Sequence, residues 1–231
     1  MSDQAIGQRV KRREDIRFIT GKGRYTDDIN VPGQTYAVFL RSPYARARIA
    51  AVDASAALAE PGVVGVFTGK DLAADGIGDL PCGWLVKSRD GTDMKIPARP
   101  PLAVEVVNFV GEPYGVVIAE TLAAARAAAA AVMTDFEELR AVADLAQATD
   151  APQIHPNVPR NLSYEWELGD AAAVDAAFAE ATHVTTLELA NNRLIPNAIE
   201  PRAALAVYDA GTEEFTLYTT SQNPHLARLI L

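Results

Sequence analysis

An alanine-rich run at residues 122–133 constrains the fold of this chain more than any other segment. Thr121 precedes the run and is a good N-cap residue, so the pattern predicts a helix. Strand-like segments flank it at 114–119 and 134–139, with β-branched and aromatic residues in short runs. Small alanine side chains let a helix lie close against a sheet. The sequence therefore predicts an α+β fold.

The same reasoning predicts further strands at 35–40, 63–68 and 104–110, the last pairing with 114–119 around Gly111-Glu112-Pro113. Asp53 is expected to cap a short helix at 54–59. Residues 74–101 are rich in glycine and proline and predict a long loop, which is usually functional or mobile.

Three prolines between residues 150 and 160 are typical of a linker, and we expect a domain boundary there. Beyond it we expect a helix at 171–180 capped by Asp170, a strand at 183–189 and a hairpin of 203–208 with 215–220. A final helix is expected from Pro224, with Asn223 as N-cap. That helix is still apolar at Leu231 without a C-cap, so we expect the chain to be cut rather than finished.

The net charge of −9 excludes several classes of function. A general nucleic-acid binder shows a basic footprint, and a protein bound to anionic lipid needs one too. The one cysteine, Cys82, excludes an internal disulfide and a multi-cysteine zinc or iron–sulfur site. No secretory signal or run long enough to span a bilayer is present, so we expect a soluble cytoplasmic protein.

Catalytic motifs are largely absent. There is no phosphate-binding loop, no pair of histidines at metal spacing and no nucleophile elbow, so no metal-binding residue is expected. His155, His183 and His225 lie far apart in sequence, and a structural role is favoured for each over catalysis. The same holds for Cys82, because nothing nearby indicates a lowered pKa. The basic arm at 9–13 is interpreted as a solvated or docking segment.

Gln222 stands out because it lies between the end of a predicted strand and the start of a predicted helix. Amide donors gather at such places, and a glutamine side chain both donates and accepts hydrogen bonds. The alternative is that Gln222 and Asn223 only cap the helix. From spacing alone the two interpretations are equally supported.

Six segments, read in order, resemble one known family. They resemble the molybdenum-binding large subunit of the xanthine dehydrogenase and aldehyde oxidase family, most strongly the aerobic carbon monoxide dehydrogenase large chain and its relatives. Each segment is weak alone, but six in the right order over nearly the whole chain are specific. The segments are Gly21-Lys22-Gly23-Arg24-Tyr25-Thr26-Asp27-Asp28-Ile29, Leu40-Arg41-Ser42-Pro43-Tyr44-Ala45, Val110-Gly111-Glu112-Pro113, Asp135-Phe136-Glu137, Ile199-Glu200-Pro201-Arg202 and Thr220-Ser221-Gln222-Asn223-Pro224-His225.

The resemblance implies an N-terminal arm at 1–19, an α/β hammerhead domain at 20–150 and a proline-rich linker at 151–160. Residues 161–231 then form the incomplete start of a molybdopterin-binding domain. The implied chemistry is hydroxylation by water of an aldehyde, a heterocycle or carbon monoxide. The implied cofactor is molybdenum held by a molybdopterin cytosine dinucleotide, which this fragment alone is not expected to hold.

Within that family, Gln222 matches the glutamine that hydrogen-bonds an oxygen ligand of the molybdenum, a supporting contact that tunes the metal. The other active-site segments of the family lie beyond Leu231, so no complete catalytic set is expected here. The implied partners are a medium subunit with FAD, a small subunit with 2Fe–2S clusters and the remainder of the large subunit. Arg46 and Ile199 depart from the family, which has histidine and methionine at those places.

Two functions remain open from the sequence. The first is the N-terminal part of a molybdenum hydroxylase large subunit, inactive alone. The alternative is a non-catalytic hammerhead module for interaction or assembly. The apolar, uncapped C-terminal helix argues against the alternative, because an independent module closes its own core. A hydrolase based on one histidine has no supporting spacing.

Overall fold

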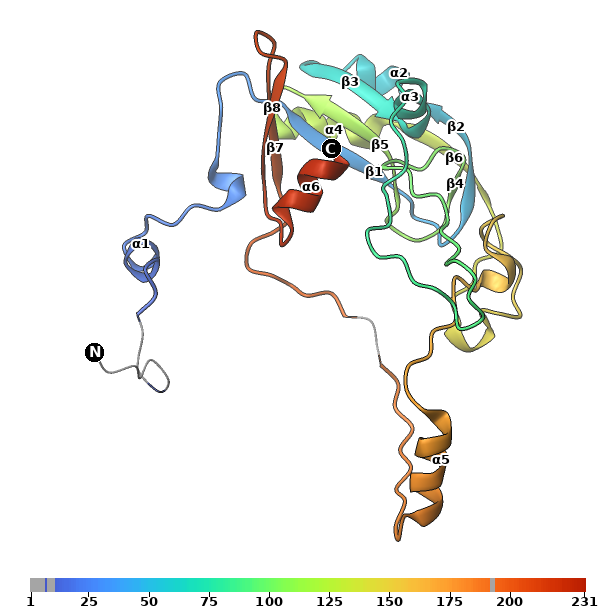
Figure 1. Ribbon diagram of the computed structural model, residues 1–231. Coiled ribbons are helices and arrows are strands. Elements are labelled where there is room, and N and C mark those ends of the chain that lie inside the picture. Colours follow the sequence, from blue (N-terminus) through green and yellow to red (C-terminus); the bar gives the residue numbers. More distant parts are fainter. Residues whose placement is uncertain (1–6, 8–10, 192–193) are drawn as a thin grey trace. The chain divides into compact units, whose positions relative to one another are not determined.

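The computed structural model describes residues 7, 11–191 and 194–231 (Figure 1). The described residues form two compact units, one of the residues up to Pro32 with 189–229, the other of 33–188. Of the predicted basic arm at 9–13, Arg9 and Val10 lie outside the described residues. In the part of the chain that is described, no helix is long and apolar enough to cross a membrane.

The larger unit, residues 33–188, contains two antiparallel sheets of three strands each. The order in the first sheet is β1-β5-β3 and in the second β4-β2-β6. The strands of the first are β1 (Tyr36–Arg41), β5 (Pro113–Ala119) and β3 (Val63–Thr68); those of the second are β4 (Val106–Val107), β2 (Ala47–Asp53) and β6 (Met133–Glu138). Mixed helices and sheets confirm the predicted α+β class.

Helix α4 (Leu122–Ala131) packs on the first sheet, where it contacts β1, β5 and β3. Its Ala125 and Ala128 are fully buried, so the predicted close approach of an alanine face to a sheet is confirmed. The Thr121 hydroxyl accepts from the backbone N–H of Ala124 at 3.1 Å, which is the expected cap. A short helix, α2 (Ser55–Leu58), packs on α4.

The structure corrects the predicted pairing of 104–110 with 114–119. Only two residues of that run form a strand, β4, and β4 pairs with β2 instead of β5. The physical reason lies at Ser42, which follows β1. Its N–H donates to Glu112 O at 2.9 Å, and its carbonyl accepts from Gly111 N at 2.8 Å. The turn is thereby bonded to the end of β1, and the residues before it cannot fold back on β5.

Two further predictions about local structure need correction. Asp53 ends β2 and does not act as the N-cap of α2, although its carboxylate accepts from Ser55 N at 2.9 Å. Residues 183–189 form no strand, because no other segment of the described chain pairs with them and their side chains are exposed. Helix α5 (Ala171–Glu180) precedes them with the predicted cap, since Asp170 accepts from Ala173 N at 3.0 Å.

The predicted loop at 74–101 has no regular strand; an isolated bridge joins Lys87 to Asp93. It follows α3 (Gly69–Ala74), a helix that the sequence did not predict and that starts with a capping box between Thr68 and Asp71. Backbone bonds tie the loop to residues 163–165. A short 3-10 helix, η2 (Leu145–Gln147), precedes the proline-rich segment, and another, η3 (Pro159–Asn161), overlaps its end. The domain boundary expected at 151–160 stays a prediction.

The smaller unit contains the hairpin of β7 (Ala204–Asp209) and β8 (Glu214–Thr219), as predicted. Asp209 closes its turn by accepting from Gly211 N at 2.8 Å. Helix α6 (Pro224–Ile230) follows β8, and Figure 1 shows this hairpin and helix in red. The N-terminal elements of the unit are α1 (Asp15–Ile19) and the 3-10 turn η1 (Thr26–Asp28).

Candidate functional site

Gln222 lies in the turn that joins β8 to α6, as the sequence predicted. Its side chain is exposed, and no described residue hydrogen-bonds its amide. The capping alternative is not observed, because no side chain caps α6. Instead the Ser221 hydroxyl accepts from Asn223 N at 3.1 Å. The donor and acceptor of the Gln222 amide are therefore uncommitted.

Two distant segments hold the residues around this turn. The Glu200 carboxylate accepts from the backbone N–H of Thr26 at 3.1 Å, and the hydroxyls of Thr26 and Thr220 lie 3.5 Å apart. Thr219, the last residue of β8, donates its hydroxyl to the Ala203 carbonyl at 3.2 Å. Three of the six family-like segments thus meet in the smaller unit. The sequence indicated each of them separately but not their contact.

The three histidines are not brought together. His155 lies in the larger unit beside a groove, and His183 shares a 3.2 Å contact between its Nε2 and the Thr185 hydroxyl. His225 is exposed on α6. Within the described residues, no group of three or more His, Cys, Asp or Glu side chains is arranged to hold a metal ion. Cys82 is half-buried, and its thiol donates to the Trp84 carbonyl at 3.3 Å.

The larger unit contains a groove that sequence reasoning missed. Two adjoining cavities of about 340 and about 590 Å³ share Glu112 and His155 among their lining residues. We call them the Glu112–His155 groove. Its walls come from the proline-rich end of the 74–101 loop, the 108–112 turn and residues 154–156. The concentration of prolines at 97–101 was the available signal.

Burial shifts the pKa of the two titratable groups that line both cavities, Glu112 and His155. It raises the pKa of the Glu112 carboxyl, although backbone N–H groups of Asn108 and Phe109 oppose the rise by donating to the ionised form. Burial also lowers the pKa of His155, and the Arg46 guanidinium lowers it further. Arg46 itself donates to Ile154 O at 3.2 Å, so it ties two segments of the larger unit together.

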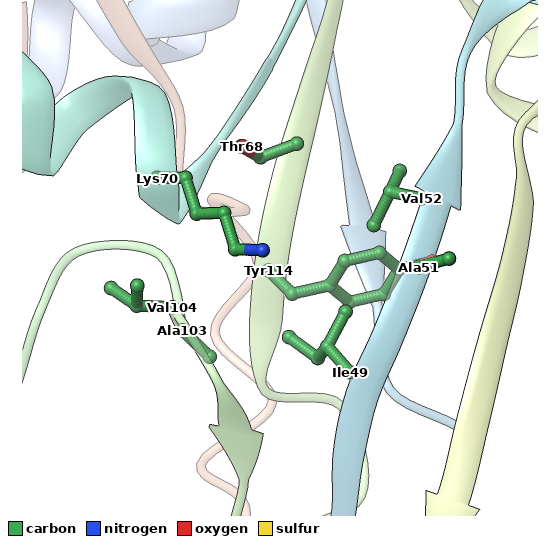
Figure 2. Close-up of a pocket in the computed structure, with 8 residues that line it drawn as sticks. All are labelled: Ile49, Ala51, Val52, Thr68, Lys70, Ala103, Val104 and Tyr114. Atoms are coloured by element: carbon green, nitrogen blue, oxygen red, sulfur yellow. The ribbon is translucent and has the colours of Figure 1, made fainter.

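A third, smaller cavity of about 130 Å³ lies against β2 (Figure 2). Its lining is mainly apolar and includes Ile49, Val52 and the ring of Tyr114. Figure 2 shows the Lys70 side chain extending from α3 toward the strand that carries Tyr114. The cavity is too small for a cofactor, because ligand pockets are typically about 300–1,000 Å³.

Comparison with protein families gives two consecutive matches. Residues 20–140 match the a/b hammerhead domain of aldehyde oxidase and xanthine dehydrogenase. Residues 154–231 match the molybdopterin cofactor-binding domain.

Curated relatives match nearly the whole chain. The nicotine 6-hydroxylase large subunit of Paenarthrobacter nicotinovorans is 35% identical over 98% of this chain and 27% of its own length. The carbon monoxide dehydrogenase large chain of Afipia carboxidovorans is 32% identical over 99% of this chain and 29% of its own. The chain therefore spans less than a third of the length of these relatives.

Solved structures show the same fold. Reconstituted CO dehydrogenase from Oligotropha carboxidovorans matches with a TM-score of 0.80 and 32% identity, over 97% of this chain and 28% of that one. Quinoline 2-oxidoreductase from Pseudomonas putida 86 matches with a TM-score of 0.78 and 31% identity, over 97% and 28% of the two chains. In both cases the likeness covers the larger and the smaller unit.

Proposed function

The chain belongs to the aldehyde oxidase and xanthine dehydrogenase family, and from this premise we propose that it forms the N-terminal part of a molybdenum hydroxylase large subunit. The observation that carries the proposal is the succession of two family domains, a hammerhead over 20–140 and the beginning of a molybdopterin cofactor-binding domain over 154–231. The proposed reaction is oxidative hydroxylation of an aldehyde, a heterocycle or carbon monoxide, with water as the oxygen source.

The residues around Gln222 fit the cofactor that this function requires. A molybdenum centre on molybdopterin cytosine dinucleotide would supply the oxidation chemistry when bound. Gln222 is the residue of this chain that would hydrogen-bond an oxygen atom of that centre, because its amide is exposed and uncommitted. A glutamine can donate from nitrogen and accept on oxygen without a change of protonation. Its contribution is to orient and tune the centre, as residues around metal ligands do.

The remaining catalytic residues and the electron carriers are proposed to come from the rest of the large subunit and from partner subunits. Two of the relatives are named as a large subunit and a large chain, and a third as the gamma subunit of a dehydrogenase complex. By analogy, we assign the remaining active-site residues to the rest of the large subunit. Electron transfer is assigned to a 2Fe–2S subunit and an FAD subunit. The cytoplasmic location expected from the sequence stays a prediction.

Elemental analysis tests this function directly. The 231-residue chain would be affinity-purified with its partners from its own cells and its molybdenum content measured. About one molybdenum atom per chain supports the proposal. An intact chain without molybdenum contradicts the proposal and favours the alternative of a non-catalytic assembly module. The isolated chain is expected to be inactive, so turnover of an aldehyde with a dye acceptor would also contradict the proposal.

Solution behaviour tests the alternative of an independent assembly module. On α6, Leu229 is 82% exposed and the adjoining Leu231 is 86% exposed. Exposed apolar surface of this kind promotes association. We therefore expect the isolated chain to self-associate in sedimentation experiments, and a Leu229→Gln, Leu231→Gln variant to do so less. A wild-type chain that is monodisperse and melts cooperatively would favour the assembly module.

A further inference from the structure

The N-terminal turn η1 is held by hydrogen bonds between its own residues. Asp28 accepts from the Tyr25 backbone N–H at 2.8 Å, and the Tyr25 carbonyl accepts from Asp28 N at 3.1 Å. These reciprocal bonds fix the turn and leave the Thr26 N–H without a partner inside it, since the first N–H groups of a helix have none. That N–H donates to the Glu200 carboxylate. Hydrogen bonds to an ionised acceptor are stronger than neutral ones.

The same threonine also reaches the turn that carries Gln222. Its hydroxyl lies 3.5 Å from that of Thr220, two residues before Gln222. Around Gln222, the hydroxyl of Ser221 is occupied by Asn223 N, and Thr219 is bonded to the opposite strand. Each neighbour on the turn is thus fixed by a hydrogen bond, while no described residue engages the Gln222 amide.

We propose that Glu200 and Thr26 are positioning residues that hold the β8–α6 turn so that the Gln222 amide stays available. The inference rests on the proposed function, which gives Gln222 its role. It also places the segment 21–29 in the same unit as Gln222, because residues up to Pro32 form one compact unit with 189–229. Glu200 acts through Thr26, and Thr26 acts on the turn through Thr220.

Hydrogen–deuterium exchange of the full 231-residue chain, read by mass spectrometry, tests the proposal. Glu200→Ala removes the acceptor, so exchange should become about five-fold faster in peptides covering 24–30 and 219–226. Glu200→Gln keeps an oxygen acceptor and should restore exchange to near the wild-type rate. Glu214→Ala is the matched control, since that carboxylate lies on β8 and has no partner among the described residues.

A purely structural role predicts a different pattern. If Glu200 only stabilised the unit, Glu200→Ala would accelerate exchange equally in the hairpin at 204–217, and the positioning role would be overturned. Unchanged exchange at 219–226 in Glu200→Ala would overturn it as well. Selective acceleration at the turn, with rescue by Glu200→Gln, supports it.

A double-mutant cycle tests the threonine contact separately. Thr26→Val and Thr220→Val each remove one hydroxyl and keep the Thr26 backbone N–H. Each should accelerate exchange at 219–226 by about two-fold, and the double variant should add little, because both remove one contact. Full additivity would overturn the coupling. These rates do not depend on molybdenum, so failure of the proposed function and failure of this inference are distinguishable.

Discussion

Tyr114 and Phe136 meet edge to face, with ring centroids 5.4 Å apart and ring planes at 90°. Tyr114 belongs to β5 of the first sheet and Phe136 to β6 of the second. The Tyr114 hydroxyl also lies 3.0 Å from that of Thr134. This pair therefore joins the two sheets of the larger unit. The ring of Tyr44 also packs on Phe136, with the ring centroids 5.3 Å apart.

Tyr114→Phe is expected to lower the free energy of unfolding by about 1 kcal/mol, because the ring contact stays and the hydroxyl bond is lost. Thr134→Val in the same background should recover part of this loss, since no unpaired hydroxyl then remains. Urea denaturation of the four variants measures the effect. If the loss of unfolding free energy in the double variant equals the sum of the losses in the two single variants, the hydroxyls do not interact.

Gly69 lies so close to the backbone of Leu102 and Ala103 that there is no room for a side chain. A Cβ at this position would be 2.4 Å from the Ala103 carbonyl oxygen and 2.6 Å from that of Leu102. Gly69→Ala should therefore destabilise the larger unit by about 2 kcal/mol or more, as overpacking does. Gly78→Ala is the control, with open space around it and an expected effect within about 0.5 kcal/mol. Thermal unfolding of both variants measures the difference.

Elements defined by local signals were predictable from sequence. The caps of Thr121 and Asp170 satisfy N–H groups three residues away, so the pattern alone indicates them. The hairpin of β7 and β8 is closed by a short turn, and its strands were predicted within one residue. The turn of Gln222 could be located for the same reason, because a strand end and a helix start fix its place.

Elements that depend on distant partners were not predictable. Strand β2 contains a bulge near Ala50, so its alternation is broken, and its partners β4 and β6 lie far along the chain. Residues 183–189 alternate, but alternation without a neighbour makes no strand. Thr26 and Glu200 are 174 residues apart in the sequence, and no local pattern around either residue predicts that they are in contact.

Ser42 is expected to be the most sensitive polar position of the larger unit. Its side chain is 2% exposed, and its hydroxyl donates to Tyr44 O at 2.9 Å and accepts from Tyr44 N at 3.0 Å. Ser42→Ala leaves both groups without that partner, so a loss of about 1–3 kcal/mol in unfolding free energy is expected. Chemical denaturation measures it. A loss below about 0.5 kcal/mol would mean that water replaces the hydroxyl at this bend.

The pKa of His155 should lie below the ordinary value of a histidine. Burial and the Arg46 guanidinium both lower its pKa, so its neutral form is favoured in the folded chain. A lowered histidine pKa stabilises the fold above the unfolded value, about 6.5, and this contribution is lost as the pH falls below it. Arg46→Gln removes one cause and should raise the His155 pKa part of the way back, because burial remains.

Proton NMR of the His155 ring, followed against pH in the wild type and in Arg46→Gln, measures this shift. The variant also loses the guanidinium bonds to Ile154 O and Arg140 O, so its unfolding free energy should be about 1 kcal/mol lower at pH 8. That deficit should shrink toward pH 5, since the charge no longer opposes protonation of His155. A deficit that stays constant or grows as the pH falls would show that the charge of Arg46 does not oppose protonation of this imidazole.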